Sequence, residues 1–318
     1  MAYIDPDMDF PAYLADPSEQ PSLTASVARD LLATAPKKVW LETQRLNPDY
    51  VRKDADKFNI GTAAHALFVG GGEPLVIIDA DDYRTKLTRE AKASAQLDGK
   101  TPILAHQYEC TLEMAAAATV QFQQNEEIAA ALIAPETLCE ASVFWDEAGI
   151  SCRCRPDFYC AIEGARPIVV HYKTTGIGQT PWTLSRYAAS LGWEITAAHY
   201  HAGIKALTGR VPAQYFAVQE QAPPYLCLTA KLDTGFVQVG EMRRKRAIQI
   251  WARCLRENDW PGNITTTVTV DCPPWHENQA IEQKDSERDA ERAGTDLLDL
   301  AAQMGIEPRD ISPQRNSS

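Results

Sequence analysis

Two short segments of this chain carry side chains that could bind a metal ion and assist hydrolysis. In the first, Asp157 follows an arginine and a proline; in the second, His171 and Lys173 flank Tyr172. Residues spaced two apart on a β-strand project to the same face, so His171 and Lys173 should reach one spot, toward which the Tyr172 carbonyl can also turn. An antiparallel strand ending at Asp157 would add a carboxylate there. This geometry suits a metal site.

The residue types in these segments match the requirements of phosphodiester hydrolysis. Near neutral pH this reaction needs a divalent metal held by oxygen ligands and a group that positions or activates the attacking water. Magnesium favours carboxylates, a backbone carbonyl and retained waters. A lysine on the inward face of a strand is costly to bury, so we predict a catalytic role for Lys173 rather than a packing role.

The strands that must position these residues are visible as alternating patterns. Residues 141–146 and 150–160 each alternate apolar and polar side chains, and Glu147-Ala148-Gly149 supplies a turn between them. Residues 167–174 form a third strand after a further turn at Glu163-Gly164-Ala165. We therefore expect an antiparallel meander that carries Asp157 and Lys173 on adjacent strands.

Helices are expected before and after this meander along the chain. A short helix over Ile60 to Phe68 contains His65 and ends at a run of glycines, Gly70 to Gly72. Thr180 and Pro181 match the N-cap and first position of a long helix, whose apolar residues recur at helical spacing as far as Leu207. Two more strands are expected at 214–219 and 225–231, followed by a helix at 236–256.

Five short motifs together resemble the PD-(D/E)xK nucleases, specifically the RecE-type (exonuclease VIII-like) phage exonuclease family. The resemblance spans roughly residues 24–255 and rests on these segments: Gly61-Thr62-Ala63-Ala64-His65, Glu140, Arg155-Pro156-Asp157, Lys173-Thr174-Thr175 and Thr196-Ala197-Ala198-His199-Tyr200. Two positions depart from the family pattern. His171 stands where the family has its second metal carboxylate, and Thr196 stands where it has glutamine.

The resemblance implies an α/β (α+β) fold with a restriction-endonuclease-like core, in which helices flank a central mixed sheet. It also implies a Mg²⁺ or Mn²⁺ site and a DNA-binding surface. The expected metal ligands are Asp157, His171, His65, Glu140 and the carbonyl of Tyr172, and the expected catalytic residues are Lys173, Asp157 and Glu140. The expected DNA contacts are Arg153, Arg155, Thr174, Thr175 and Tyr200.

The function implied by the resemblance is degradation of linear double-stranded DNA from its 5′ end in recombination. Family members work with a single-strand annealing protein and form ring-like homo-oligomers, so both are expected partners here. His171 suits manganese or zinc better than magnesium and removes a negative charge, so we expect an attenuated enzyme. Two alternatives stay open: a catalytically inactive DNA-binding or assembly protein that kept the fold, and a structural protein whose strands only mimic the motif.

Composition limits the remaining possibilities. The net charge of −12 argues against a protein that coats nucleic acid through an overall basic surface, but it does not exclude a local basic channel. None of the eight cysteines forms a CxxC pair, which disfavours zinc-ribbon and thioredoxin-like chemistry. No apolar run approaches the roughly 20 residues of a membrane helix, and the acidic start lacks a signal-peptide pattern. We expect a cytoplasmic protein with no membrane partner.

Composition also divides the chain into three parts. Residues 1–21 are rich in proline and aspartate and are expected to form an irregular arm. Residues 22–272 are expected to form the nuclease-like domain. Residues 273–318 are polar and are expected to form a flexible tail.

Overall fold

The computed structural model describes residues 1–50, 60–70, 74–263 and 266–292. The chain divides into two compact units, residues 1–263 and 264–318, and the second contains helix α11 (Pro274–Arg292). Segment 1–21 was expected to be irregular. It contains strand β1 (Tyr3–Asp5) and helix α1 (Phe10–Ala15), which Asp9 caps by accepting from the Ala12 N–H.

A five-stranded mixed sheet forms the centre of the first unit, in the order β10-β9-β8-β7-β4. Strands β8 and β9 are parallel, and the other neighbours are antiparallel. The helices of the crossover connection between β8 and β9 lie on one face of the sheet, as a parallel pair requires. The strands are β4 (Thr137–Cys139), β7 (Phe158–Cys160), β8 (Ile168–Thr175), β9 (Ala213–Glu220) and β10 (Cys227–Ala230).

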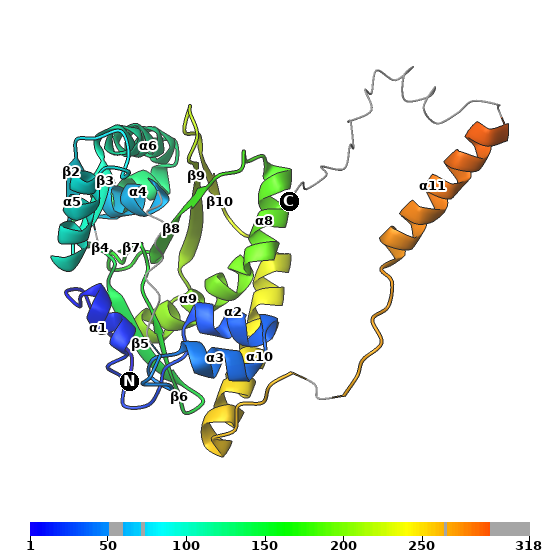
Figure 1. The fold of residues 1–318 in the computed structure, drawn as a ribbon. Helices are drawn as coiled ribbons and strands as arrows, with labels where there is room; N and C mark the ends of the chain where they lie inside the picture. The colour runs from blue at the N-terminus through cyan, green and yellow to red at the C-terminus, as the bar shows by residue number, and fades with distance from the viewer. Residues whose placement is uncertain (51–59, 71–73, 264–265, 293–318) are drawn as a thin grey trace. The chain divides into compact units, whose positions relative to one another are not determined.

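Helices cover both faces of this sheet (Figure 1). Tyr172 and Tyr215 pack on one face against α4 (Ile60–Val69), α6 (Ala105–Gln123) and α7 (Glu126–Ile133). Phe216 and Val218 alternate with Tyr215 and pack on the other face against α8 (Pro181–Leu191) and α9 (Trp193–Thr208). The prediction of a mixed α/β fold with a central sheet flanked by helices is confirmed.

A second, three-stranded sheet has the order β1-β5-β6 and carries the largest core. Trp145 of this sheet and Trp251 both belong to this core, and both are almost fully buried. The helices that contribute to this core are α2 (Ala25–Ala33), α9 and α10 (Thr234–Glu257). Its long strands are β5 (Ser142–Glu147) and β6 (Ile150–Cys154).

The expected single meander is wrong in one respect: residues 150–160 form two strands rather than one. Strand β6 pairs with β5, whereas β7 pairs with β4 and β8 in the central sheet. The break falls at Arg155-Pro156-Asp157, where proline has no N–H to donate to a strand partner. The chain therefore leaves one sheet and enters the other at the residues that carry the motif.

The expected long helix is also two helices, α8 and α9, separated by Gly192. Gly192 has φ of 66°, in the left-handed region, where a glycine is favoured because it lacks a Cβ. Helical spacing of apolar residues continues through this position, so periodicity alone did not reveal the break. Apolar residues of α9 contribute to the cores of both sheets.

The other elements lie around these two sheets. They are α3 (Pro36–Glu42), β2 (Leu75–Ile78), α5 (Lys86–Leu97) and β3 (Thr101–Leu104), with β2 and β3 forming a parallel pair. Within the described ranges, none of the helices has both the length and the apolar character needed to cross a bilayer.

Candidate metal and DNA site

The first side chain of the candidate site, His65, is placed by the close approach of α4 to the end of β8. Gly61 lies one turn before His65 and is buried. A Cβ on Gly61 would collide with the hydroxyl of Thr174 and would also stand 2.6 Å from the Nε2 of Gln221. Glycine at position 61 therefore lets the helix pack tightly against the end of β8. This places His65, one turn later, near Asp157.

Asp157 lies just before strand β7, and its carboxylate accepts a hydrogen bond from a backbone N–H of the neighbouring strand β8. Its Oδ2 accepts a 2.7 Å hydrogen bond from the backbone N–H of Tyr172 and lies 3.4 Å from the Nζ of Lys173. Asp157 is 8% exposed, whereas the side chain of Lys173 is 39% exposed. Asp157 and Lys173 thus lie together, as the strand spacing predicted, and the lysine reaches solvent.

Glu140 lies at the other place where the chain passes between the sheets, between β4 and β5. Its φ of 55° is in the left-handed region, which is unusual for a residue with a side chain. The Glu140 N–H donates to the Asp157 carbonyl at 3.2 Å, which ties the two crossings together. Its Oε2 accepts a 2.8 Å hydrogen bond from the Nε of Arg155.

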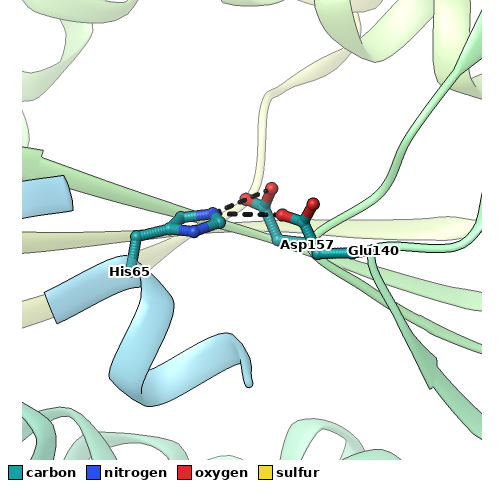
Figure 2. A group of neighbouring side chains, drawn as sticks. All are labelled: His65, Glu140 and Asp157. Carbon is teal, nitrogen blue, oxygen red and sulfur yellow. Dashed lines mark ion pairs between the residues drawn. The ribbon is translucent and has the colours of Figure 1, made fainter. Parts of the chain in front are cut away.

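The three side chains converge (Figure 2). The Nε2 of His65 lies 3.3 Å from Asp157 Oδ1 and 3.7 Å from Glu140 Oε1. One ligand atom from each residue lies within 4.8 Å of the other two. Around a cation bound at about 2.1 Å, adjacent ligand atoms stand roughly 3.0–3.5 Å apart, so two of these contacts need only a small adjustment.

In each carboxylate, one oxygen bonds to other protein groups and the other points to the space between the three side chains, here called the shared centre. The outer oxygens, Asp157 Oδ2 and Glu140 Oε2, are held by Tyr172, Lys173 and Arg155. The inner oxygens face His65 (Figure 2). Groups that orient a ligand from behind in this way are a regular feature of metal sites. The donor set of two oxygens and one imidazole nitrogen fits a divalent cation, with further positions left for water and substrate.

The charge state of Asp157 also suits a ligand. Burial raises the pKa of its carboxyl group, but Lys173 and His65 more than offset this, with a weaker effect of His171. The net result is that the pKa of Asp157 is held below its ordinary range. Asp157 is therefore ionised at every pH at which the protein would work.

His171 lies outside this cluster in the described part of the chain, although the sequence predicted it as a ligand. It is 1% exposed, and its ring stacks on Phe216 and meets Tyr200 edge-on. Its Nε2 lies 2.8 Å from the Oε1 of Gln214. Burial, together with Lys173, lowers the pKa of His171 to about 4, so the imidazole is neutral at neutral pH.

Arg153 of β6 and Arg155, which follows that strand, were predicted to contact DNA, and both are largely buried. Arg153 pairs with Asp16 at 2.7 Å and also bonds Ser22. Arg155 holds Glu140 and also donates to the Met8 carbonyl and the Ser142 hydroxyl, at 2.8 and 2.7 Å. The structure therefore uses both guanidinium groups inside the fold, and their contact with DNA stays a prediction.

The other residues predicted to bind DNA or metal, Thr174, Thr175, Tyr200 and Tyr172, form hydrogen bonds within the fold. Thr174 accepts from the Gln221 amide at 3.1 Å, beside Gly61, and Thr175 caps the turn after β8 by accepting from the Ile177 N–H. The hydroxyl of Tyr200 donates to the Arg155 carbonyl at 2.9 Å, and that of Tyr172 donates to Gln219 at 2.6 Å.

Sequence reasoning missed Gln214, which touches His171 from the next strand. Gln214 is 8% exposed, and its amide Nε2 donates to the Ala197 carbonyl at 2.8 Å. The available signal was a polar residue within a largely apolar strand, since a buried amide needs partners for both its ends.

Comparisons with known proteins leave the function to be argued from this geometry. No protein-family model matches the chain, and no curated protein matches it. Among solved structures, the chain is similar to a protein described as a proposed exonuclease from Eubacterium rectale, at 11% identity and a TM-score of 0.47, over 78% of this chain and 91% of that one. It also resembles a protein designated SSO0001, at 9% identity and a TM-score of 0.30, over 75% and 80% of the two chains. Likeness at this level carries no argument about activity, and the RecE-type resemblance stays a prediction.

Proposed function

We propose that this chain is a metal-dependent exodeoxyribonuclease of the PD-(D/E)xK class that acts on linear double-stranded DNA. The observation that carries the proposal is the convergence of His65, Glu140 and Asp157, with Lys173 on the outer oxygen of Asp157. Parallel strands β8 and β9 joined by a helical crossover, with the motif on β8, agree with the core that the resemblance implies.

A bound divalent cation would supply Lewis-acid activation of water and neutralise charge on the phosphate. The chain would hold it through His65 Nε2, Glu140 Oε1 and Asp157 Oδ1. Manganese is the proposed cofactor in preference to magnesium, because an imidazole nitrogen replaces one of the oxygens that magnesium favours. The neutral His171 ring behind the site contributes no negative charge, which weakens attraction for either cation.

Lys173 has the position and the exposure of a group that acts on substrate. Its ammonium is anchored to Asp157 on one side and open to solvent on the other. A cation there can stabilise the charge that develops on a phosphate during hydrolysis and can orient the attacking water. Its strand neighbour Tyr172 fixes this geometry by donating its N–H to the same carboxylate oxygen.

The same geometry also favours a second candidate, a catalytically inactive DNA-binding or assembly protein. Arg155 and Lys173 already neutralise the two carboxylates from within the chain, and His171 provides no third acid. A site balanced in this way is stable without any cation. We rank this function second because one oxygen of each carboxylate still faces the shared centre.

The deciding experiment is an assay on a linear duplex labelled at either the 5′ or the 3′ end, with a closed circular duplex as the negative substrate. With manganese, we expect loss of label from the 5′ end of the linear duplex only. Asp157→Asn and Lys173→Met should each reduce the rate by roughly a hundredfold or more. Lys205→Met, an exposed lysine on α9, is the matched control and should retain the rate.

Each contrary result has a defined meaning. Equal rates in wild-type, Asp157→Asn and Lys173→Met proteins would show that the activity does not come from this site. Binding of the duplex without cleavage under any divalent cation would establish the second candidate instead.

The expected partners and location remain part of the proposal. These are a homo-oligomer encircling the duplex and a single-strand annealing protein that receives the product strand. A ring could turn acidic surfaces outward and basic ones toward the channel, which would reconcile the net charge of −12 with DNA binding. All eight cysteines are free thiols, which agrees with a reducing compartment such as the cytoplasm.

A further inference from the structure

The guanidinium group of Arg155, which holds the proposed metal ligand Glu140, is itself held by the N-terminal part of the chain. Its Nε donates to Glu140 Oε2 at 2.8 Å. Its Nη1 donates to the Met8 carbonyl at 2.8 Å and to the Ser142 hydroxyl at 2.7 Å. A guanidinium group is a rigid planar fork, so bonds that fix Nη1 also fix the direction of the Nε–H bond. The orientation of Glu140 therefore depends in part on the segment that contains Met8.

Tyr13 of helix α1 covers the same guanidinium group. Its ring centroid lies 5.7 Å from the central guanidinium carbon of Arg155 and 5.1 Å from that of Arg153. A cation within about 6 Å of an aromatic ring face is attracted to the ring. Tyr13 is 8% exposed, so its ring also keeps water away from Arg155, and a hydrogen bond between charged groups is stronger where water is excluded. Tyr13 thus stabilises the pair of Arg155 and Glu140.

The segment that carries Tyr13 is anchored at both ends. Strand β1, which precedes it, pairs with β5 of the three-stranded sheet. Asp16, which follows α1, is 3% exposed and accepts from the N–H and the hydroxyl of Ser22, at 2.7 and 2.9 Å. Asp16 also pairs with Arg153. Residues 8–16 are therefore held in a defined position, unlike the irregular arm that composition predicted.

The backbone on either side of Pro156 is held by other residues. The Tyr200 hydroxyl donates to the Arg155 carbonyl at 2.9 Å, and the Nε2 of His199 lies 3.0 Å from the Arg153 carbonyl. Both side chains come from α9. Loss of the Tyr13 ring should therefore leave this backbone in place and release only the guanidinium group.

We propose that Tyr13 is a positioning residue of the metal site and that residues 8–16 complete this site. The Tyr13 ring and the Met8 carbonyl hold the Arg155 guanidinium group, and Arg155 in turn directs Glu140 Oε1 toward the shared centre. The inference rests on the proposed function for the identity of the bound cation. The contacts from Tyr13 to Glu140 exist without any cation, and Tyr13 lies outside every motif of the nuclease resemblance.

The first test titrates manganese into the full chain and measures its affinity by calorimetry. Tyr13→Leu removes the ring and should lower manganese affinity by about tenfold, within the range for a lost cation–π contact behind a ligand. Tyr13→Met, whose flexible side chain fills the same space, is a second variant without the ring and should match Tyr13→Leu. Tyr13→Phe keeps the ring and should bind as wild type does. The matched control is Tyr3→Leu, which removes a ring that stacks on Phe144 at 5.0 Å, and it should also retain the affinity.

The second test asks whether Tyr13 acts through Arg155. Tyr13→Leu is introduced into the Arg155→Met protein, which lacks the group that holds Glu140, and the manganese affinities of the two proteins are compared. Residues in one chain of contacts have non-additive effects, whereas independent structural damage adds. We therefore expect the double variant to bind manganese within about twofold of Arg155→Met alone.

A measurement without metal separates this inference from the proposed function. In ¹⁵N NMR of the metal-free chain, the Arg155 Nε–H is assigned by its absence from the Arg155→Met spectrum. Its exchange with water should be about tenfold faster in Tyr13→Leu than in wild type, because the guanidinium group opens more often. Tyr13→Phe should exchange at the wild-type rate. If these rates are found but the wild type does not bind manganese, the metal proposal fails while the positioning of Glu140 by Tyr13 stands.

Three results would overturn the role of Tyr13. One is unchanged manganese affinity and unchanged Arg155 exchange in the variants without the ring. Another is an equal loss in Tyr13→Phe or Tyr3→Leu, which would assign the effect to the hydroxyl or to general damage of the segment. The last is a further tenfold loss in the double variant, which would show that Tyr13 acts independently of Arg155.

Discussion

The ring Nε2 of His171 lies 2.8 Å from the Oε1 of Gln214, and the amide Nε2 of the same glutamine lies 2.8 Å from the Ala197 carbonyl. A carbonyl can only accept, so the glutamine must donate to Ala197 and must present its oxygen to the histidine. The neutral imidazole therefore carries its proton on Nε2 and keeps its lone pair on Nδ1. The backbone of α9 thus selects the tautomer of a residue on β8.

We predict that ring ¹⁵N NMR of the full chain at pH 7 will find His171 as the Nε2-protonated tautomer. Gln214→Leu should destroy this preference and lower the free energy of unfolding by about 1–3 kcal/mol, because it leaves two buried polar groups unpaired. His199 is an internal control, since its Nε2 lies 3.0 Å from the Arg153 carbonyl and does not depend on Gln214. Detection of the Nδ1-protonated form of His171 in the wild type would contradict the assignment.

Arg155 should matter for the metal although it is not a ligand. It holds the outer oxygen of Glu140, so Arg155→Met frees that side chain to rotate away from His65. We expect manganese affinity to fall by about 10–100-fold, the usual cost of losing a group that orients a ligand. Calorimetric titration measures this directly, with Arg210→Met, an exposed arginine that bonds the Ala165 carbonyl, as the control. Equal affinity in all three proteins would refute the orienting role.

Gly61→Ala should damage both stability and the site. The added methyl group collides with the Thr174 hydroxyl and pushes α4, with His65, away from β8. Overpacking of this kind costs about 1–3 kcal/mol, measurable by urea unfolding, and the displaced histidine should weaken manganese binding. Gly176→Ala is the matched control, because a Cβ at Gly176 meets open space. A Gly61→Ala protein with unaltered stability and manganese affinity would show that this packing does not position His65.

Restoring an acid at position 171 should change the metal preference. His171→Asp adds a carboxylate on the strand face shared with Lys173, so we expect magnesium to support DNA cleavage that in the wild type requires manganese. The comparison is the ratio of rates with the two metals on the labelled duplex. His106→Asp, which adds the same charge on the exposed surface of α6, should leave the ratio unchanged. No rise in the magnesium rate would argue that His171 does not attenuate the enzyme.

His171 should also make folding sensitive to acid. Its pKa is about 4 in the folded chain and about 6.5 when unfolded, so between these values the unfolded state binds the extra proton. Stability from this group is fully present above about pH 6.5 and is lost as pH falls toward 4, by roughly 3 kcal/mol in total. Urea unfolding at pH 7 and pH 5 should show a smaller loss for His171→Asn, which does not titrate. An identical pH dependence in both proteins would exclude this contribution.

The sequence predicted those parts of the fold and site that depend on local patterns. Sequence patterns located α4 and α10 to within a residue or two, and the strand alternation placed Lys173 beside Asp157. The break at Gly192 and the passage between sheets at Pro156 were not predictable in this way. In both places, apolar periodicity runs on through a residue whose effect is decided by packing far away in the sequence.

The partners of the predicted site residues were equally hidden. Arg155 binds Glu140 across 15 positions, Arg153 meets Ser22 across 131, and Gln214 meets His171 across 43. A single sequence reports which side chains could carry charge into a site, but not which of those charges the fold neutralises itself. For this reason, two arginines predicted to face DNA are found bonded inside the fold.

Both carboxylates of the site stand at the two places where the chain steps from one sheet to the other, and the Glu140 N–H donates across this step to the Asp157 carbonyl. A cation bound by both carboxylates would therefore link the two sheets at these crossings. Movement of one sheet relative to the other would separate the two carboxylates, so a bound cation would oppose that movement. Manganese should therefore slow amide hydrogen exchange along β5 and β7.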